Sequence, residues 1–246
     1  MFVVAVTSLG SGLDEEAQRL AADLGYTPYE ARLRLAGGLP SVVLQTPDKA
    51  RALGLLSRLR ARGHGAVACD EGAIVSLEAM LLLRDFRFDP AGISVLGTHG
   101  EPIDAVARAD LLCLLRLSHR RTETSTVVQK QTTFSAGRAI VSGGLLLTKT
   151  KEREVTQRSD SKEQVLVLYR RGGPPLALRE TAAHYDALGA ERAPTTILNF
   201  QRAVDRIRAI APHAPYDDRL VQRKLREGDG GIEVLAHLLA MSLATS

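Results

Sequence analysis

The amino-acid sequence predicts an α+β protein, in which a small β-α-α-β-α-β domain is followed by a mostly β domain with a C-terminal helix. Short apolar runs typical of buried strands recur along the chain. Three segments within the first 72 residues combine a helical spacing of apolar residues with helix-capping residues. A chain of 246 residues with 45% apolar content is long enough to bury a core in each domain.

The domain predicted over residues 1–72 begins with a strand and a helix. Residues 2–6, Phe-Val-Val-Ala-Val, form a continuous apolar run of strand-forming residues. Over residues 13–24 the apolar positions fall on one side of a helix. Three acidic residues fill its first turn, where the helix dipole favours negative charge, and Gly25 is its predicted end.

Capping residues predict two further helices, and strands follow each of them. The sequence Thr-Pro-Tyr-Glu at residues 27–30 is a capping box with proline at the first helical position. A strand is predicted over residues 41–45. The sequence Thr-Pro-Asp at residues 46–48 then predicts a third helix that starts in the same way, and residues 66–69 form the last strand.

The turn between the first two helices carries a resemblance to a known family. Gly25, Glu30, Ala31 and Arg32, together with the order of elements, resemble the C-terminal domain of the ribosomal stalk protein, which has Gly-Leu-Gly-Leu-Lys-Glu-Ala-Lys there. The Ala-Arg-Gly-His-Gly segment at residues 61–65 is similar to the family's Glu-Ala-Gly-Ala before the last strand. The resemblance implies an interaction module, and a similar fold occurs in an adaptor that delivers substrates to an ATP-dependent protease.

The first helix departs from that family. In the stalk protein this helix carries basic residues that contact translation factors, whereas here it opens with Asp14, Glu15 and Glu16. The resemblance therefore implies a fold and a binding role, and the contact with translation factors does not carry over.

A second domain is predicted over residues 80–212. Its strands are expected at residues 85–89, 93–96, 111–117, 164–169 and 176–178. The last two flank a Gly-Gly-Pro-Pro turn, and an amphipathic helix over residues 195–211 closes the domain, with Ile197 at the start of its apolar stripe. Several strands closed by one helix resemble a bacterial pleckstrin-homology-like barrel, which implies contacts with proteins or membrane surfaces.

Residues 120–162 form an insert that is rich in serine, threonine and basic residues. It holds nine basic and four acidic residues, a surplus of five, while the net charge of the chain is +4. A site for a polyanion is therefore expected within the insert. The candidate partner-binding residues are Arg120, Arg121, Lys130, Arg138, Lys149, Lys151 and Arg153.

The sequence is compatible with three structures for this insert. The first is a long hairpin, which projects from the domain or packs on its own protein, and the second is a flexible loop. In the third, an apolar centre at residues 139–147 docks to a partner or enters a lipid interface, while Lys149, Lys151 and Arg153 meet anionic groups.

Residues 213–246 form a tail with a short helix predicted over residues 232–243. This helix is apolar on most faces and too short to span a membrane, so we expect it to be buried against its own domain or a partner subunit. The N-terminal segment has no signal-peptide pattern, and a cytoplasmic location is expected.

The sequence contains no pattern that predicts a catalytic, cofactor or metal site. Its six histidines do not occur at metal-ligand spacing, and Cys69 and Cys113 lie apart in apolar runs. The Leu-Gly-Ser-Gly-Leu loop at residues 9–13 lacks the lysine and the later glycine of a phosphate-binding loop. His64, at the end of a helix, is assigned to an interaction with the helix dipole.

These observations predict a non-enzymatic protein-interaction or adaptor protein of the bacterial cytoplasm. Its partner is an unknown protein, bound through the surfaces of the two domains, and the insert or the C-terminal helix provides contacts with a partner or with a second copy of the chain. The alternative is a weak, sequence-independent binder of nucleic acid or of an anionic membrane surface through residues 120–162, which predicts strong weakening by salt. Phe134 is the one aromatic residue of the insert, which argues against recognition by base stacking.

Overall fold

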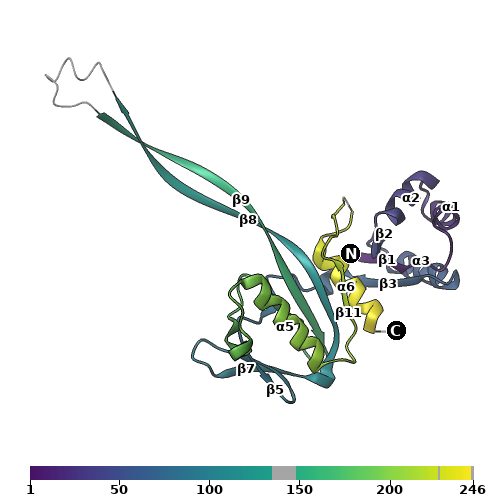
Figure 1. Cartoon of the computed structure of the whole chain (residues 1–246). Helices are drawn as coiled ribbons and strands as arrows, with labels where there is room; N and C mark the ends of the chain where they lie inside the picture. The colour runs from purple at the N-terminus through teal and green to yellow at the C-terminus, as the bar shows by residue number, and fades with distance from the viewer. Residues whose placement is uncertain (135–147, 227, 245–246) are drawn as a thin grey trace. The chain divides into compact units, whose positions relative to one another are not determined.

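The computed structural model describes residues 1–134, 148–226 and 228–244, and over residues 121–134 and 148–161 it describes the backbone. It confirms the α+β class (Figure 1). The first part of the chain follows the predicted order of elements. These are β1 (Phe2–Ser8), α1 (Leu13–Leu24), α2 (Pro28–Ala36), β2 (Ser41–Thr46), α3 (Lys49–Ala61) and β3 (Gly65–Asp70).

β1 is the central strand of a three-stranded antiparallel sheet in the order β2-β1-β3. Val4 and Val6 pack into a core formed with α1, α2 and α3. Val3 and Ala5 contribute to a second core, on the other face of the sheet, which contains α6 (Ile232–Ala244). Because both faces are covered, the strand is apolar at successive positions, as its sequence indicated.

Side chains fix the starts of α2 and α3. The Thr27 hydroxyl accepts a hydrogen bond from the Glu30 N–H, and the Glu30 carboxylate accepts one from the Thr27 N–H, which confirms the predicted capping box. The predicted start of α3 is corrected, because its cap is Asp48 and Thr46 belongs to β2. The Asp48 carboxylate accepts hydrogen bonds from two backbone N–H groups of the first turn.

The second part of the chain forms two sheets with the strand orders β11-β8-β9-β10-β4 and β5-β6-β7. The strands are β4 (Leu81–Leu82), β5 (Asp85–Asp89), β6 (Gly92–Leu96), β7 (Pro102–Ala107), β8 (Leu111–Phe134), β9 (Thr148–Arg170), β10 (Leu176–Arg179) and β11 (Tyr216–Leu220). Both sheets are open, so the predicted barrel-like arrangement is wrong.

The reason for the open arrangement is that the larger sheet is buried on both faces. Cys113 and Leu115 of β8 lie in the core that contains α6. Leu114, between them, lies in a different core with α5 (Thr196–Ile210) and the β5-β6-β7 sheet. In a closed barrel each strand buries only the face that points inward, whereas the strands of this sheet have apolar side chains to bury on both faces.

α5 covers one of these faces with Phe200, Val204 and Ile207. Ile197, predicted to start the apolar stripe, is instead 67% exposed. The first turn is oriented by Asn199, whose side chain accepts a hydrogen bond from the Ala193 N–H and donates one to its carbonyl. Residues two positions apart face different sides of a helix, so docking of Asn199 leaves Ile197 in solvent.

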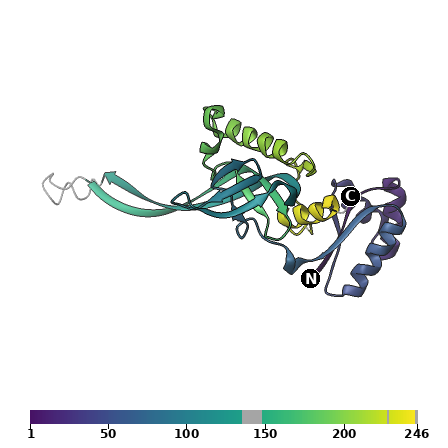
Figure 2. The same ribbon diagram turned by 90° about the horizontal axis from the view of Figure 1, so that it is seen from below.

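α6 covers the other face of the larger sheet, between that sheet and the β2-β1-β3 sheet (Figure 2). Leu235, Leu238 and Leu239 are almost completely buried. The C-terminal helix is therefore packed within its own chain, as expected. Among the described residues no helix is both long and apolar enough to cross a membrane.

The chain divides into two compact units, residues 1–119 with 164–246, and residues 120–163. The first unit includes both three-stranded sheets and the helices α1 to α3, α5 and α6. The described residues of the second belong to the C-terminal part of β8 and the N-terminal part of β9, which are neighbouring strands. The insert therefore contains a strand pair, and its apolar centre at 139–147 lies outside the described residues.

Candidate interaction site

The residues proposed for partner binding lie mostly on this strand pair. Arg120 is exposed, and Arg138 falls outside the described residues. The six candidates within the described residues lie on two neighbouring strands of the 120–163 unit. β8 carries Arg120, Arg121 and Lys130, and β9 carries Lys149, Lys151 and Arg153.

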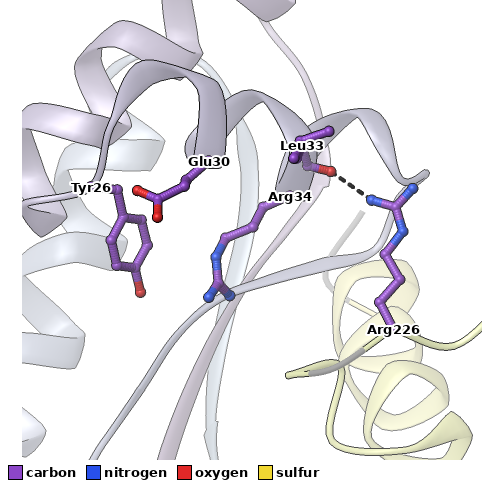
Figure 3. A pocket seen from close by; sticks show the side chains of 5 residues that line it. All are labelled: Tyr26, Glu30, Leu33, Arg34 and Arg226. Carbon is purple, nitrogen blue, oxygen red and sulfur yellow. Dashed lines mark hydrogen bonds between the residues drawn. The ribbon is translucent and has the colours of Figure 1, made fainter.

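A second candidate lies on α2, where the sequence indicated none. α2 and the segment that joins β11 to α6 border a hollow of about 410 Å³ (Figure 3). We call this hollow the α2 groove. Its lining residues are Tyr26, Glu30, Leu33, Arg34 and Arg226.

α2 exposes large apolar side chains beside the groove. Tyr29 is 68% exposed and Leu33 is 49% exposed, and they lie one turn apart on the same side of the helix. Leu225, next to the arginine of the opposite wall, is also exposed. The inner side of α2 packs on the core through Ala31 and Leu35. Exposed apolar side chains that occur together are typical of binding surfaces.

Two arginines supply the positive charge of the groove. The guanidinium of Arg34 lies 5.0 Å from the centre of the Tyr26 ring, a cation-π contact. Arg226 donates a hydrogen bond of 2.5 Å from Nη1 to the Leu33 carbonyl (Figure 3). The two cations therefore approach the groove from opposite walls.

The lining carboxylate, Glu30, is already engaged. It accepts hydrogen bonds from the backbone N–H of Thr27 at 2.8 Å and from its hydroxyl at 2.9 Å. The backbone hydrogen bond and then the hydroxyl hydrogen bond lower the pKa of Glu30, so the group is ionised at neutral pH. Its negative charge serves the start of α2.

A buried ion pair fixes the segment that carries Arg226. Nη2 of Arg223 lies 3.3 Å from Oδ2 of Asp229, and both side chains are buried. Arg223 also donates hydrogen bonds to the carbonyls of Gly37 and Gly38 at the end of α2. A side chain at Gly37 would collide with the Arg226 guanidinium. No local sequence pattern connects partners so far apart in the chain, which is why sequence analysis missed them.

The structure corrects the role predicted for His64. Its Nδ1 accepts a hydrogen bond of 3.0 Å from the Gly10 N–H, and its Nε2 lies 2.7 Å from the Glu16 carboxylate. Because Nδ1 is an acceptor, Nε2 carries the hydrogen and donates a hydrogen bond to the Glu16 carboxylate. Gly10 itself packs against Gly63, where a Cβ atom would overlap the carbonyl. His64 and the glycine loop therefore serve packing.

Other polar pairs occur apart from the groove. Nδ1 of His184 lies 2.8 Å from the Asp85 carboxylate, and about half of the His184 side chain is exposed, as in a surface ion pair. His237 lies beside Tyr169, with 6.2 Å between the ring centres. In the described part of the chain, no group of three or more His, Cys, Asp or Glu residues could hold a metal ion.

The two cysteines have the environment of apolar residues. Cys113 is buried and Cys69 is half-buried. Burial raises the pKa of Cys113 to about 12 and also raises the pKa of Cys69. The reactive thiolate form is therefore scarce at neutral pH, which disfavours a nucleophilic role for either residue.

No family model, no curated protein and no solved structure matches this chain. The resemblances of residues 1–72 to the ribosomal stalk domain and of residues 80–212 to a pleckstrin-homology-like domain stay predictions from the sequence.

Proposed function

We propose that the protein is a non-enzymatic interaction protein of the bacterial cytoplasm, which acts as an adaptor by holding a partner segment in the α2 groove. The observation that carries this proposal is the exposure of Leu33 in the groove lining with Arg34 and Arg226, while Tyr29 is exposed one helical turn away. Tyrosine and arginine are enriched at the energetic centres of protein interfaces. The resemblance of residues 1–72 to interaction modules supports the same function.

The energetics of the groove favour association. A partner would remove the exposed parts of Tyr29 and Leu33 from water, and each gains a fraction of the roughly 1.5–3 kcal/mol that full burial of a large apolar side chain contributes. The walls are already ordered by the capping box of α2 and by the ion pair of Arg223 with Asp229. Little additional ordering is required on binding, which lowers its entropic cost.

The substitution Leu33→Asp tests this function in affinity capture from a native lysate. Leu53 on α3 is the matched control, because it is also 49% exposed. We expect the proteins captured by the wild type and by Leu53→Asp to be lost with Leu33→Asp, since a carboxylate replaces apolar contact area. Equal capture by all three proteins would contradict the proposal.

A second candidate function is the binding of nucleic acid or an anionic membrane surface by the 120–163 unit. One observation favours it: six of the seven basic candidates lie on the neighbouring strands β8 and β9. A two-stranded ribbon fits the major groove of DNA, and clustered basic residues attract phosphates.

A quadruple glutamine variant at Arg120, Arg121, Lys149 and Lys151 tests this candidate with a labelled DNA duplex and with phosphatidylserine vesicles. Binding by the wild type should weaken steeply between about 50 and about 200 mM salt and be lost in the variant. Partner capture that survives both the variant and nuclease treatment would reject this candidate and leave the α2 groove as the site.

A further inference from the structure

We propose that the partner segment in the α2 groove is an acidic peptide, whose carboxylates bind Arg34 and Arg226 while an apolar side chain packs on Leu33. This inference rests on the proposed function and specifies its partner.

The two arginines have hydrogen-bond donors to spare. A guanidinium carries five N–H donors in a planar arrangement. Arg226 uses Nη1 for the Leu33 carbonyl. Arg34 contacts the face of the Tyr26 ring, and among the described residues none accepts a hydrogen bond from its guanidinium. A carboxylate is the acceptor that matches this donor geometry, because it binds a guanidinium through two parallel hydrogen bonds.

The charge balance of the groove favours an anionic ligand. Its lining holds two guanidinium groups and one carboxylate, Glu30, which is hydrogen-bonded to Thr27 and also interacts electrostatically with Arg34, so one positive charge is in surplus. Lys224, in the same segment as Arg226, is exposed and adds positive charge nearby. An incoming carboxylate therefore meets a net attraction.

The apolar side chains distinguish a peptide from a nucleic acid. Leu33 lines the groove, Tyr29 is exposed one turn away on α2, and Leu225 is exposed next to Arg226 in the chain. A phosphate backbone would leave these side chains in water, whereas a peptide with alternating acidic and apolar residues satisfies both kinds of surface.

Arg226 is placed in advance of binding. Its segment is tied to the end of α2 by Arg223, which pairs with Asp229 and donates to the carbonyls of Gly37 and Gly38. Arg223 is thus a positioning residue for the groove. A donor that is already oriented loses less conformational freedom when the ligand arrives.

Fluorescence anisotropy with defined peptides tests the inference. The probe is fluorescein-labelled Glu-Glu-Leu-Phe-Glu-Glu, and its uncharged counterpart is Gln-Gln-Leu-Phe-Gln-Gln. We expect the double variant Arg34→Gln/Arg226→Gln to bind the acidic probe at least roughly tenfold more weakly than the wild type. The uncharged peptide should bind the wild type more weakly by a similar factor.

The control variant is Arg51→Gln/Arg84→Gln, which removes the same charge at two exposed arginines outside the groove. It should bind the acidic probe within about twofold of the wild type. Equal weakening in both double variants would show non-specific attraction and overturn the inference.

Three further results would overturn it. The first is that the acidic probe does not bind at about 1 mM protein, and the second is that both peptides bind equally. The third is that a single-stranded oligonucleotide of equal charge binds more tightly than the acidic probe and that its binding depends on Arg34 and Arg226. If any of these occurs while Leu33→Asp still abolishes partner capture, the adaptor function stands and the acidic partner is rejected. If Leu33→Asp loses no partner, the proposed function itself is rejected.

Discussion

At the scale of single residues, Glu16 shows how a buried charge is tolerated. Its side chain has no exposed surface, and its two oxygens accept hydrogen bonds of 2.7 Å from Arg62 and from His64. Asp23 binds the other terminal nitrogen of Arg62 at 2.8 Å. Burial of a carboxylate is costly unless such partners compensate for the lost water, so this network ties α1 to the end of α3.

Glu16→Gln should destabilise the protein by about 3 kcal/mol, measured by urea unfolding. An amide has one acceptor oxygen, so its NH2 group would face the donating Nε2–H of His64, and Arg62 would lose its buried countercharge. The control is Glu15→Gln. Glu15 pairs with Arg19 on the exposed side of α1, and its replacement should cost under about 0.5 kcal/mol. If Glu16→Gln and Glu15→Gln both lower the unfolding free energy by the same small amount, the stabilising role of the network is contradicted.

His237 gives stability a pH dependence. Burial lowers its pKa below the ordinary value of 6.5, so the unfolded state binds the proton first as the pH falls. Stability is complete above the unfolded pKa and decreases as the pH falls towards the folded pKa. His237→Leu should therefore flatten the decrease in unfolding free energy between about pH 7 and about pH 5.5.

Urea unfolding of the wild type and of His237→Leu at several pH values measures this dependence. An unchanged slope in His237→Leu would show that other groups cause the pH dependence.

At the scale of elements, the helices and strands of the first 70 residues were predictable because their signals are local. The capping box joins Thr27 and Glu30 within one turn, and the start of α3 was misplaced by only two residues, from Thr46 to Asp48. The arrangement of the later strands was not predictable in this way. Whether β8 belongs to a barrel or to an open sheet depends on α6, which lies far along the chain at Ile232–Ala244.

α6 should couple the two sheets on either side of it. Leu238→Ala removes a completely buried side chain and should cost about 3 kcal/mol in urea unfolding. Leu243→Ala, at a partly buried position in the last turn, should cost less. Hydrogen exchange of the β1 and β8 amides should increase together in Leu238→Ala. An increase confined to one sheet would show that α6 belongs to that sheet alone.

At the scale of the whole molecule, the division into two units makes the 120–163 unit dispensable for folding. Replacing residues 121–162 by an Asn-Gly turn should change the unfolding free energy of the remaining unit by less than about 1 kcal/mol, because its cores consist of its own residues. A larger loss, or loss of a cooperative transition, would contradict this division.

The two candidate sites differ in how far the sequence indicated them. The basic residues of the insert were found from charge alone. The α2 groove was missed because Arg226 reaches α2 only through the fold, although one local signal was present. Ala31 and Leu35 form the buried side of α2, and Tyr29 and Leu33 are additional large apolar residues on a different, exposed side of the same helix.

Site-specific photo-crosslinking tests the central claim most directly. A photoreactive phenylalanine is placed at Leu33, and in a second protein at the equally exposed Leu53, and both are irradiated in the native lysate. The account predicts a discrete crosslinked protein at Leu33 only, with the attachment point in an acidic segment that mass spectrometry identifies. No crosslink at Leu33, or the same products at both positions, would contradict it.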